Sequence, residues 1–340
     1  MDTLKGFMAF SRLGATLTAL EIRELVKADL EKMERVIGLE SVASADAVTS
    51  ISRHLQANGG KRLRPILLLL ANKLAGTTND SAIALAAVVE MIHTATLVHD
   101  DVIDDARTRR GKPSANVLWG NQTCVLAGDW LYMQAFQIAL RERNFAILDI
   151  LITLTQMMVE GELRQLETMG KIGVTESDYM ELVDRKTASL FAACARLGAV
   201  VAGASEDVES RLNDFAWNLG MAFQLVDDVL DFTASERVLG KPVGNDLREG
   251  KVTLPLIYAL GAATPEEREM VARVLADRHY DNVSFSTVQT IVKRYDGIAR
   301  AKARAQEFTE KARSMMLSFP ESPYQRALYA VTDLVTERDH

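Results

Sequence analysis

The sequence predicts an all-α protein, and two observations lead to that expectation. The 340 residues include only seven prolines, and apolar side chains recur over long stretches with the 3.6-residue period of a helix. No run shows sustained alternation of apolar and polar residues bounded by turns, which would predict strands. Because no linker divides the chain, we expect one domain over residues 1–340, with residues 1–18 as a weakly patterned N-terminal arm.

Caps and stop signals set the bounds of the expected helices. Residues 58–60 (Asn-Gly-Gly) stop one helix, and one of residues 79–81 caps the long helix that follows. Thr175 and Asp178 form a capping box at the start of another helix. Residues 253–336 form further amphipathic helices without a chemical cluster. The remaining expected helices span residues 19–37, 46–57, 66–75, 122–142, 145–168, 176–203 and 207–233.

Composition excludes several classes of protein. With a net charge of −7, the chain lacks the basic character usual in a nucleic-acid binder. Cys124 and Cys194 lie in apolar helical patterns, so we expect reduced core thiols in a cytoplasmic protein. The N-terminus has no basic segment followed by an apolar run, so no signal peptide is expected. The apolar stretches 81–98 and 189–205 each contain a charged residue, which predicts core helices and not membrane spans.

A basic turn precedes the third expected helix. It holds Lys61, Arg62 and Arg64, and Pro65 can occupy the first position of the helix over 66–75. Backbone amides at a helix start, together with three cations, make a plausible anion site. Taken alone, however, a basic turn is more often a solvated loop.

The stretch from 81 to 112 organises the rest of the chain. It is apolar for nearly five turns and then delivers four aspartates, among which residues four apart share a helix face. His93 lies two turns before the first aspartate on the same face. Cations follow the cluster at once. The aspartates are Asp100, Asp101, Asp104 and Asp105, and the cations are Arg109, Arg110 and Lys112.

A divalent metal bound to a phosphorylated substrate would explain this cluster. Mg²⁺ is usually held by one or two carboxylates together with waters and substrate phosphates. Arginine side chains match phosphate oxygens through paired hydrogen bonds. The alternative is a solvated acidic helix end, which for a single DDxxD sequence is the commoner case.

A second aspartate cluster ends the helix over 207–233. Asp227 and Asp231 are four residues apart on one face, Asp228 lies beside them, and Gln224 is three residues earlier. The loop that follows has two glycines and a proline, so it is a candidate mobile lid. Its charged residues include Lys241, Asp246, Arg248 and Lys251. If the two helices are neighbours, the clusters face each other across a cavity and form a site for several Mg²⁺ ions bridged by one diphosphate.

At this point the chain resembles a known family, the trans-isoprenyl diphosphate synthases or polyprenyl synthetases. The resemblance spans about residues 45–255. The chain is most like the bacterial long-chain members, which make octaprenyl to decaprenyl tails for quinones. It implies a helical bundle around a central apolar cavity, a Mg²⁺-dependent prenyltransferase (Mn²⁺ can substitute) and a homodimer that contacts its partner through helices near 114–142. The matching motifs are GGKRLRP, EMIHTATLVHDDVIDDARTRRGKPS, DRKTASLF, GMAFQLVDDVLDF and GKPVGND, in family order.

The resemblance also implies a role for each matching residue. Asp100 and Asp104 match Mg²⁺ ligands of the first motif, with Asp101 beside them, and Asp227 and Asp231 match those of the second, with Asp228 beside them. Asp105 departs slightly, because many relatives have glutamate there. The isopentenyl diphosphate site is matched by Lys61, Arg64, His93 and Arg110, and the allylic diphosphate site by Arg109, Lys186, Thr187, Gln224 and Lys241.

The implied chemistry needs no protein nucleophile. Mg²⁺ and cations stabilise the departing allylic diphosphate, isopentenyl diphosphate attacks the allylic cation, and a proton is then lost. Ala95 and Thr96 lie one turn below Asp100, where the growing chain descends, and their small side chains predict a long tunnel. Met133, Phe136 and residues 145–160 are candidates for its floor.

Alternatives remain open at this point. Taken without its neighbours, Lys186 could simply extend along an apolar surface with its charge in water. A shorter-chain synthase making farnesyl or geranylgeranyl diphosphate uses the same motifs. A class I terpene cyclase also uses DDxxD, but its second motif differs from the residues after Asp228. A regulatory subunit of a heteromeric prenyl synthase tends to lack one aspartate motif, whereas both are present here.

Overall fold

The computed structural model describes residues 17–57, 60–233 and 243–336. Lys241 and most of the expected N-terminal arm lie outside these ranges. The all-α expectation is confirmed, because helices make up nearly all regular structure in the described ranges. A short antiparallel pair of strands, β1 (Thr108–Arg109) and β2 (Lys112–Pro113), is the exception among them and was not expected from the sequence.

The helices follow one another with short connections. Those of the first half are α2 (Ala19–Glu24), α3 (Lys27–Glu40), α4 (Asp46–Ala57), α5 (Leu63–Ala75), α6 (Asp80–Ile103), α7 (Ala115–Trp119), α8 (Asn121–Arg141) and α9 (Phe145–Thr168). Those of the second half are α10 (Glu176–Val183), the π-helical turn η1 (Asp184–Ala188), α11 (Ser189–Val201), α12 (Glu206–Thr233), α14 (Asn245–Arg248), α15 (Leu254–Leu260), α16 (Pro265–Asp277), α17 (Phe285–Arg294), α18 (Gly297–Met316) and α19 (Pro323–Thr336).

Three expected helix bounds are corrected by the structure. The helix expected over 19–37 is two helices, because the chain leaves helical geometry at Val26. The helix expected over 176–203 contains a π-helical turn at 184–188, a feature often found at functional sites. The third expected helix begins at Leu63 and not after Pro65, so the proline sits inside the first turn, where its missing N–H costs nothing.

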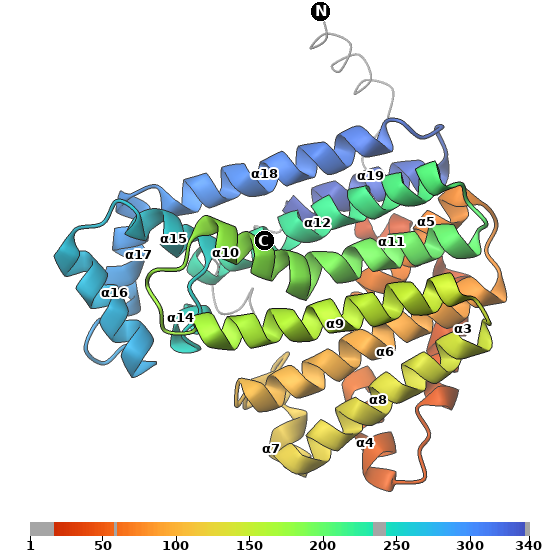
Figure 1. The fold of residues 1–340 in the computed structure, drawn as a ribbon, viewed down its shortest axis with the longest axis horizontal. Coiled ribbons are helices and arrows are strands. Elements are labelled where there is room, and N and C mark those ends of the chain that lie inside the picture. The colour runs from red at the N-terminus through yellow and green to blue at the C-terminus, as the bar shows by residue number, and fades with distance from the viewer. Residues whose placement is uncertain (1–16, 58–59, 234–242, 337–340) are drawn as a thin grey trace, which may run out of the picture.

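The long helices form a bundle in which α6, α8, α9, α11 and α12 run alongside one another (Figure 1). Helix α18 packs along α12, and α14 to α17 gather at one end of the bundle. Most buried apolar side chains join one core between these helices. A smaller cluster packs Phe232, at the end of α12, against α14 to α17. The end of α12 that bears the second aspartate cluster is therefore packed between the main core and this smaller cluster.

Close backbone contacts bring the site helices together. A Cβ at Gly220 of α12 would lie 2.7 Å from the Cα of Ala188, so only glycine allows α12 to approach η1 this closely. A Cβ at Gly198 of α11 would lie 2.4 Å from the carbonyl oxygen of Leu68 in α5. These contacts set α11 and η1 against both α5 and α12, which places Lys186 and Thr187 beside α12.

Two expectations about buried residues can be compared with the structure. Cys124 and Cys194 are free and buried, as expected for reduced core thiols. Within the described residues, α6 is the one helix long and apolar enough to cross a membrane. Its most apolar window is 67% buried against other helices, which is the arrangement of a core helix.

Candidate active site

A cavity of about 640 Å³ lies between α6, α8, α9, α11 and α12. Its charged end is formed by side chains from several helices, including Asp100 of α6, Lys186 of η1 and Asp227 of α12. Most of the remaining wall is apolar. That wall includes Leu97, Val102, Ile103, Val125, Met158, Val159, Leu163, Leu166, Leu190 and Phe223. The two aspartate clusters therefore do face a common space, as the sequence predicted from their repeated motif.

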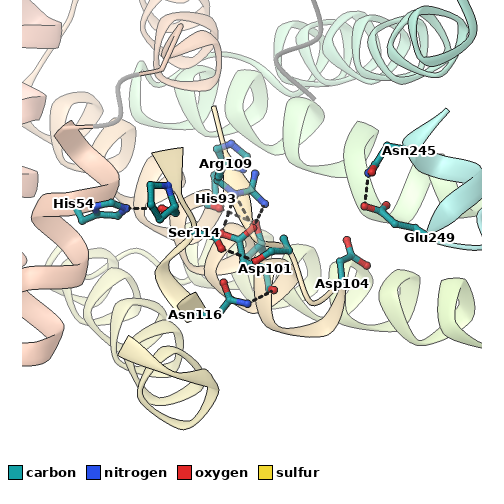
Figure 2. Close-up of polar contacts among 12 residues, drawn as sticks. His54, His93, Asp101, Asp104, Arg109, Ser114, Asn116, Asn245 and Glu249 are labelled. Atoms are coloured by element: carbon teal, nitrogen blue, oxygen red, sulfur yellow. Dashed lines mark hydrogen bonds and ion pairs between the residues drawn. The ribbon is translucent and has the colours of Figure 1, made fainter. Parts of the chain in front are cut away.

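The aspartates of the first cluster point in different directions. Asp100 lines the cavity, whereas Asp101 is buried and accepts hydrogen bonds from Arg109 Nε and Nη2, the shortest at 2.7 Å. Asp104 ends α6 and pairs with Lys251, whose Nζ lies 3.1 Å from its Oδ2. Figure 2 shows Arg109 folded onto Asp101, with Asp104 on the side that faces Asn245 and Glu249.

Burial changes the proton affinity of Asp100. Loss of water raises the pKa of its carboxyl to about 6. The cation of Lys186 opposes this rise, while the carboxylates of Glu162 and Asp104 add to it. Asp100 thus lacks full charge compensation from its surroundings, and a further cation would stabilise its ionised form.

The second cluster divides in the same way. Asp227 lines the cavity, but Asp228 is buried and accepts hydrogen bonds from Tyr179 Oη (2.6 Å) and Gln224 Nε2 (2.7 Å). Burial raises the pKa of Asp228 to about 8, and the nearby carboxylate of Asp246 contributes to the rise. Asp231 is fully buried, and its Oδ2 accepts from the backbone N–H of Asp246 at 3.3 Å. Like Asp104, it does not line the cavity, and its predicted role as a metal ligand stays a prediction.

A basic group lies on the α5 side of the cavity. Arg64 Nη1 is 3.2 Å from His93 Nε2, and both side chains line the cavity together with Arg110. Burial lowers the pKa of His93 well below its usual range, and Arg64, Arg109 and Arg110 reinforce the effect. His93 is therefore neutral at pH 7 and accepts a hydrogen bond from Arg64 through an unprotonated Nε2.

The residues that the sequence predicted for the allylic diphosphate are linked by a chain of hydrogen bonds across η1 and α12. Thr187 Oγ1 donates to Gln224 Oε1 at 2.9 Å, and Gln224 in turn donates to Asp228. Lys186 Nζ lies 2.5 Å from Glu162 Oε2 and donates to Gln165 Oε1 at 3.2 Å. A second, more polar cavity of about 340 Å³ lies behind these residues, so they form a wall between two spaces.

Several predicted site residues do not line the main cavity. Lys61 is exposed, Arg109 is engaged by Asp101, and Lys241 lies outside the part of the chain that the structure describes. Of the two chain-length candidates, Thr96 lines the cavity, but Ala95 is fully buried in the core. Among the floor candidates, Met133 is 64% exposed on the outer face of α8, which contradicts that prediction.

Other residues at the site were not predicted. Glu162 and Gln165 of α9 hold Lys186, and Tyr179 holds Asp228. Glu162 and Gln165 are one turn apart on one helix, which was the available signal for these two residues. Tyr132 of α8 also lines the cavity and stacks on His99, with ring centroids 5.9 Å apart. A Cβ at Gly128 would lie 2.2 Å from His99 Nε2, so glycine leaves room for that ring.

The carboxylates fit a hard divalent cation. Asp100 and Asp104 are one turn apart, Asp227 lies on the facing wall, and oxygen donors are those that Mg²⁺ prefers. Within the described ranges, no three His, Cys, Asp or Glu side chains converge as a preformed cage. That arrangement suits an ion that takes its other ligands from waters and substrate phosphates.

Comparisons with known proteins agree with this geometry. The sequence profile of the polyprenyl synthetase family matches residues 45–292. The chain is 34% identical to the octaprenyl diphosphate synthase of Escherichia coli, with 94% of this chain and 98% of the relative covered. It is 41% identical to an all-trans-nonaprenyl-diphosphate synthase of Rhodobacter capsulatus, covering 92% and 96%. It is also 39% identical to a geranylgeranyl diphosphate synthase of Sulfolobus acidocaldarius, covering 72% and 76%.

Solved structures have the same fold. A polyprenyl synthase from Caulobacter crescentus, complexed with calcium and isoprenyl diphosphate, matches with a TM-score of 0.91 at 35% identity, covering 96% of this chain and 99% of that one. A decaprenyl diphosphate synthase from Rhodobacter capsulatus matches with a TM-score of 0.90 at 34% identity, covering 95% and 100%.

Proposed function

The chain belongs to the polyprenyl synthetase family, and we propose that it condenses isopentenyl diphosphate repeatedly, in trans, with an allylic diphosphate such as farnesyl diphosphate. Membership confirms the resemblance drawn from the motifs, and it makes the protein a prenyltransferase. The observation that best supports the reaction is the cavity itself. Asp100 and Asp227, one from each aspartate cluster, both line it, and many of the other lining side chains are apolar.

We assign the allylic diphosphate to the aspartate end of the cavity. Asp100, Asp104 and Asp227 would hold divalent ions, with Mg²⁺ the ion best suited to carboxylate and phosphate oxygens. Such ions supply Lewis-acid stabilisation of the leaving diphosphate. Lys186 and Gln224 line the same end and present a cation and an amide to the phosphate oxygens. The Caulobacter crescentus polyprenyl synthase, complexed with calcium and isoprenyl diphosphate, supports a divalent ion and a diphosphate as ligands of this fold.

Isopentenyl diphosphate would bind at the basic group of Arg64, His93 and Arg110. Two guanidinium groups suit phosphate oxygens, and the neutral imidazole can donate through its Nδ1–H because its Nε2 accepts from Arg64. This group and the aspartate end line one cavity, so the double bond of one substrate can reach the allylic carbon of the other. The apolar wall excludes water from the allylic cation until a proton is lost.

Long-chain product is the reading that we favour. The octaprenyl and nonaprenyl relatives match more than nine-tenths of the chain, and the relative with 41% identity makes a nonaprenyl product by its name. Thr96 presents a small side chain to the cavity one turn below Asp100. A product of that length would serve as the side chain of a quinone. A shorter-chain synthase is the second candidate, because its relatives are similar in identity.

We further propose a homodimer formed through α8 and α9. These neighbouring helices each expose an apolar stripe with a seven-residue spacing, the spacing of helices that pack side by side. The stripes consist of Leu126, Met133 and Leu140 on α8 and of Phe145 and Ile152 on α9, which are 48% to 88% exposed in the single chain. A second copy would cover both stripes. The free thiols support a cytoplasmic location.

The assay with radiolabelled isopentenyl diphosphate tests the function directly. The purified protein, farnesyl diphosphate and Mg²⁺ should yield products that, after dephosphorylation, migrate as long-chain prenyl alcohols. Products of farnesyl or geranylgeranyl length would favour the shorter-chain synthase. Conversion of the allylic diphosphate to a hydrocarbon without isopentenyl diphosphate would instead identify a terpene cyclase.

A further inference from the structure

Arg62 is a buried arginine that lies beside the site without lining the cavity. Its side chain is 10% exposed and makes ion pairs with two glutamates from different helices. Arg62 Nε lies 2.6 Å from Glu34 Oε1 in α3, and Nη1 lies 2.6 Å from Glu90 Oε1 in α6. Nη2 also donates to Glu34 Oε2 at 3.2 Å, so all three nitrogens are used. Arg62 therefore joins the start of α5 to both α3 and α6.

The backbone of Arg62 shows why such anchoring is needed. Its φ of 52° and ψ of 33° lie in the left-handed region, which is unfavourable for a residue with a side chain. Its carbonyl oxygen accepts from Ile66 N–H at 3.0 Å, so Arg62 is the residue at which the chain enters α5. An unfavourable backbone conformation persists when the surrounding contacts hold it. The ion pairs with Glu34 and Glu90 are such contacts.

The contacts between α5 and α6 form two parallel pairs. Arg62 and Arg64 are two residues apart at the start of α5, and Glu90 and His93 are one turn apart on α6. Arg62 pairs with Glu90, and Arg64 contacts His93 at 3.2 Å. Only the second pair lines the cavity. The first pair therefore fixes the position from which the second pair faces the substrate.

We propose that Arg62 is a positioning residue, and that its pairing with Glu34 and Glu90 holds the turn that presents Arg64 to the diphosphate of isopentenyl diphosphate. The inference rests on the proposed function, which assigns that diphosphate to Arg64, His93 and Arg110. Arg62 does not touch the substrate. It acts on binding of one substrate and leaves the aspartate end of the cavity unchanged.

Steady-state kinetics of Arg62→Gln, Arg62→Lys and Glu90→Gln test the proposal. Arg62→Gln and Glu90→Gln should each raise the KM for isopentenyl diphosphate about tenfold, with kcat and the allylic KM within about twofold of wild type. Arg62→Lys should lie between, because lysine keeps one charge pair but cannot form the paired hydrogen bonds of a guanidinium group. The double variant Arg62→Gln/Glu90→Gln should resemble Arg62→Gln, since Arg62→Gln already removes the contact with Glu90.

Opposite results would overturn the proposal. If Arg62 touched the diphosphate itself, Glu90→Gln would free its charge and lower the KM for isopentenyl diphosphate. If the ion pair were important only for folding, the melting temperature would fall while both KM values stayed at those of wild type. Should Arg62→Gln fail to fold, Glu90→Gln and Arg62→Lys still distinguish these outcomes.

A matched control separates stability from positioning. Arg313 of α18 pairs with Asp333 of α19, and their side chains are 20% and 12% exposed. Arg313→Gln should lower the melting temperature and leave both KM values unchanged. Absence of condensation by the wild-type protein would overturn the proposed function and this inference with it. Condensation by wild type, with an unchanged KM in all three single variants, would overturn the inference alone.

Discussion

Lys251 Nζ lies 3.1 Å from Asp104 Oδ2 and 2.5 Å from Glu249 Oε2, so a buried lysine joins the first aspartate cluster to the segment after α12. The side chains are only 16% to 23% exposed. Asp104 is one of the predicted metal ligands, and in this arrangement a protein cation balances its charge. A divalent ion that binds Asp104 must therefore compete with Lys251.

The first prediction follows from that competition. Lys251→Met leaves Asp104 and Glu249 without their buried cation, so the melting temperature without metal should fall. Mg²⁺ should then raise the melting temperature more in this variant than in wild type, because it restores the missing charge. Lys73→Met is the control, since Lys73 pairs with Asp29 at 2.9 Å with similar burial and does not line the cavity. An equal Mg²⁺ shift in Lys251→Met and wild type would contradict the competition.

The second prediction separates the aspartates by their positions. Asp100→Asn and Asp227→Asn should each lower kcat by about 10²-fold or more, the scale for losing a main electrostatic stabiliser. Excess EDTA should abolish turnover of the wild-type protein. Asp231→Asn should affect the melting temperature more than kcat, because Asp231 is fully buried and accepts from the backbone of Asp246.

The contrast with Asp231 is the sensitive part of this experiment. An Asp231→Asn variant as inactive as Asp227→Asn, with an unchanged melting temperature, would make Asp231 a metal ligand as the motif first suggested. Near-normal kcat in Asp100→Asn would instead count against the whole metal site.

The third prediction concerns the pH dependence of stability. His93 has a lowered pKa in the folded state, so below about pH 6.5 the unfolded chain binds a proton that the folded chain does not. This group therefore contributes stability above that pH and loses it as the pH falls, by up to about 1.4 kcal/mol per pH unit. Asp100 and Asp228 have raised pKa values and act in the opposite direction.

Comparing the pH dependence of stability in wild type and in His93→Gln measures the contribution of His93 alone. In His93→Gln the side chain can still accept from Arg64 but does not titrate, so its free energy of unfolding should fall less between pH 7 and pH 5 than that of wild type. Urea unfolding of both proteins at several pH values, without metal, measures this. Parallel curves would show that His93 is not held neutral in the folded protein.

The sequence predicted those site residues whose positions depend on spacing within one helix. Asp100 and Asp227 end apolar helices, and Gln224 is one turn from Asp227, so the helical period alone put them on defined faces. Contacts between residues far apart in the chain could not be predicted from the sequence. Lys251 and Asp104 are 147 residues apart, and Arg109 turns onto Asp101 because of a hairpin that no strand pattern indicated. The break at Val26 was missed because apolar spacing continues across it.

The same limit affected the residues expected to set product length. Ala95 and Thr96 are neighbours in sequence, and spacing from Asp100 could not decide which of them lines the cavity. The structure places Thr96 on the wall and Ala95 in the core. Met158 of α9 lies on the wall and within the range 145–160 that the sequence offered for the floor, whereas Tyr132 of α8 also lines the wall but had no distinctive sequence signal.

The last prediction uses this difference between neighbours. Thr96→Phe adds a ring to the cavity wall one turn from Asp100, and a growing prenyl chain cannot share that space in a close-packed site. Products should therefore shorten toward farnesyl or geranylgeranyl length, while kcat for the first condensation remains near that of wild type. Tyr132→Ala removes a ring that α8 contributes to the cavity wall and should permit product at least as long as that of wild type.

Ala95→Phe is the matched variant for this test, because it adds the same ring one residue away. Ala95 is fully buried in the core, so the extra volume should overpack the helices at a cost of about 1–3 kcal/mol and lower the melting temperature. Product length should change less than in Thr96→Phe in whatever activity remains. Chromatography of dephosphorylated products from both variants decides the matter. The opposite result would reverse the assignment: a stable Ala95→Phe protein that makes short product and a Thr96→Phe protein that makes long product. The path of the growing chain would then pass Ala95.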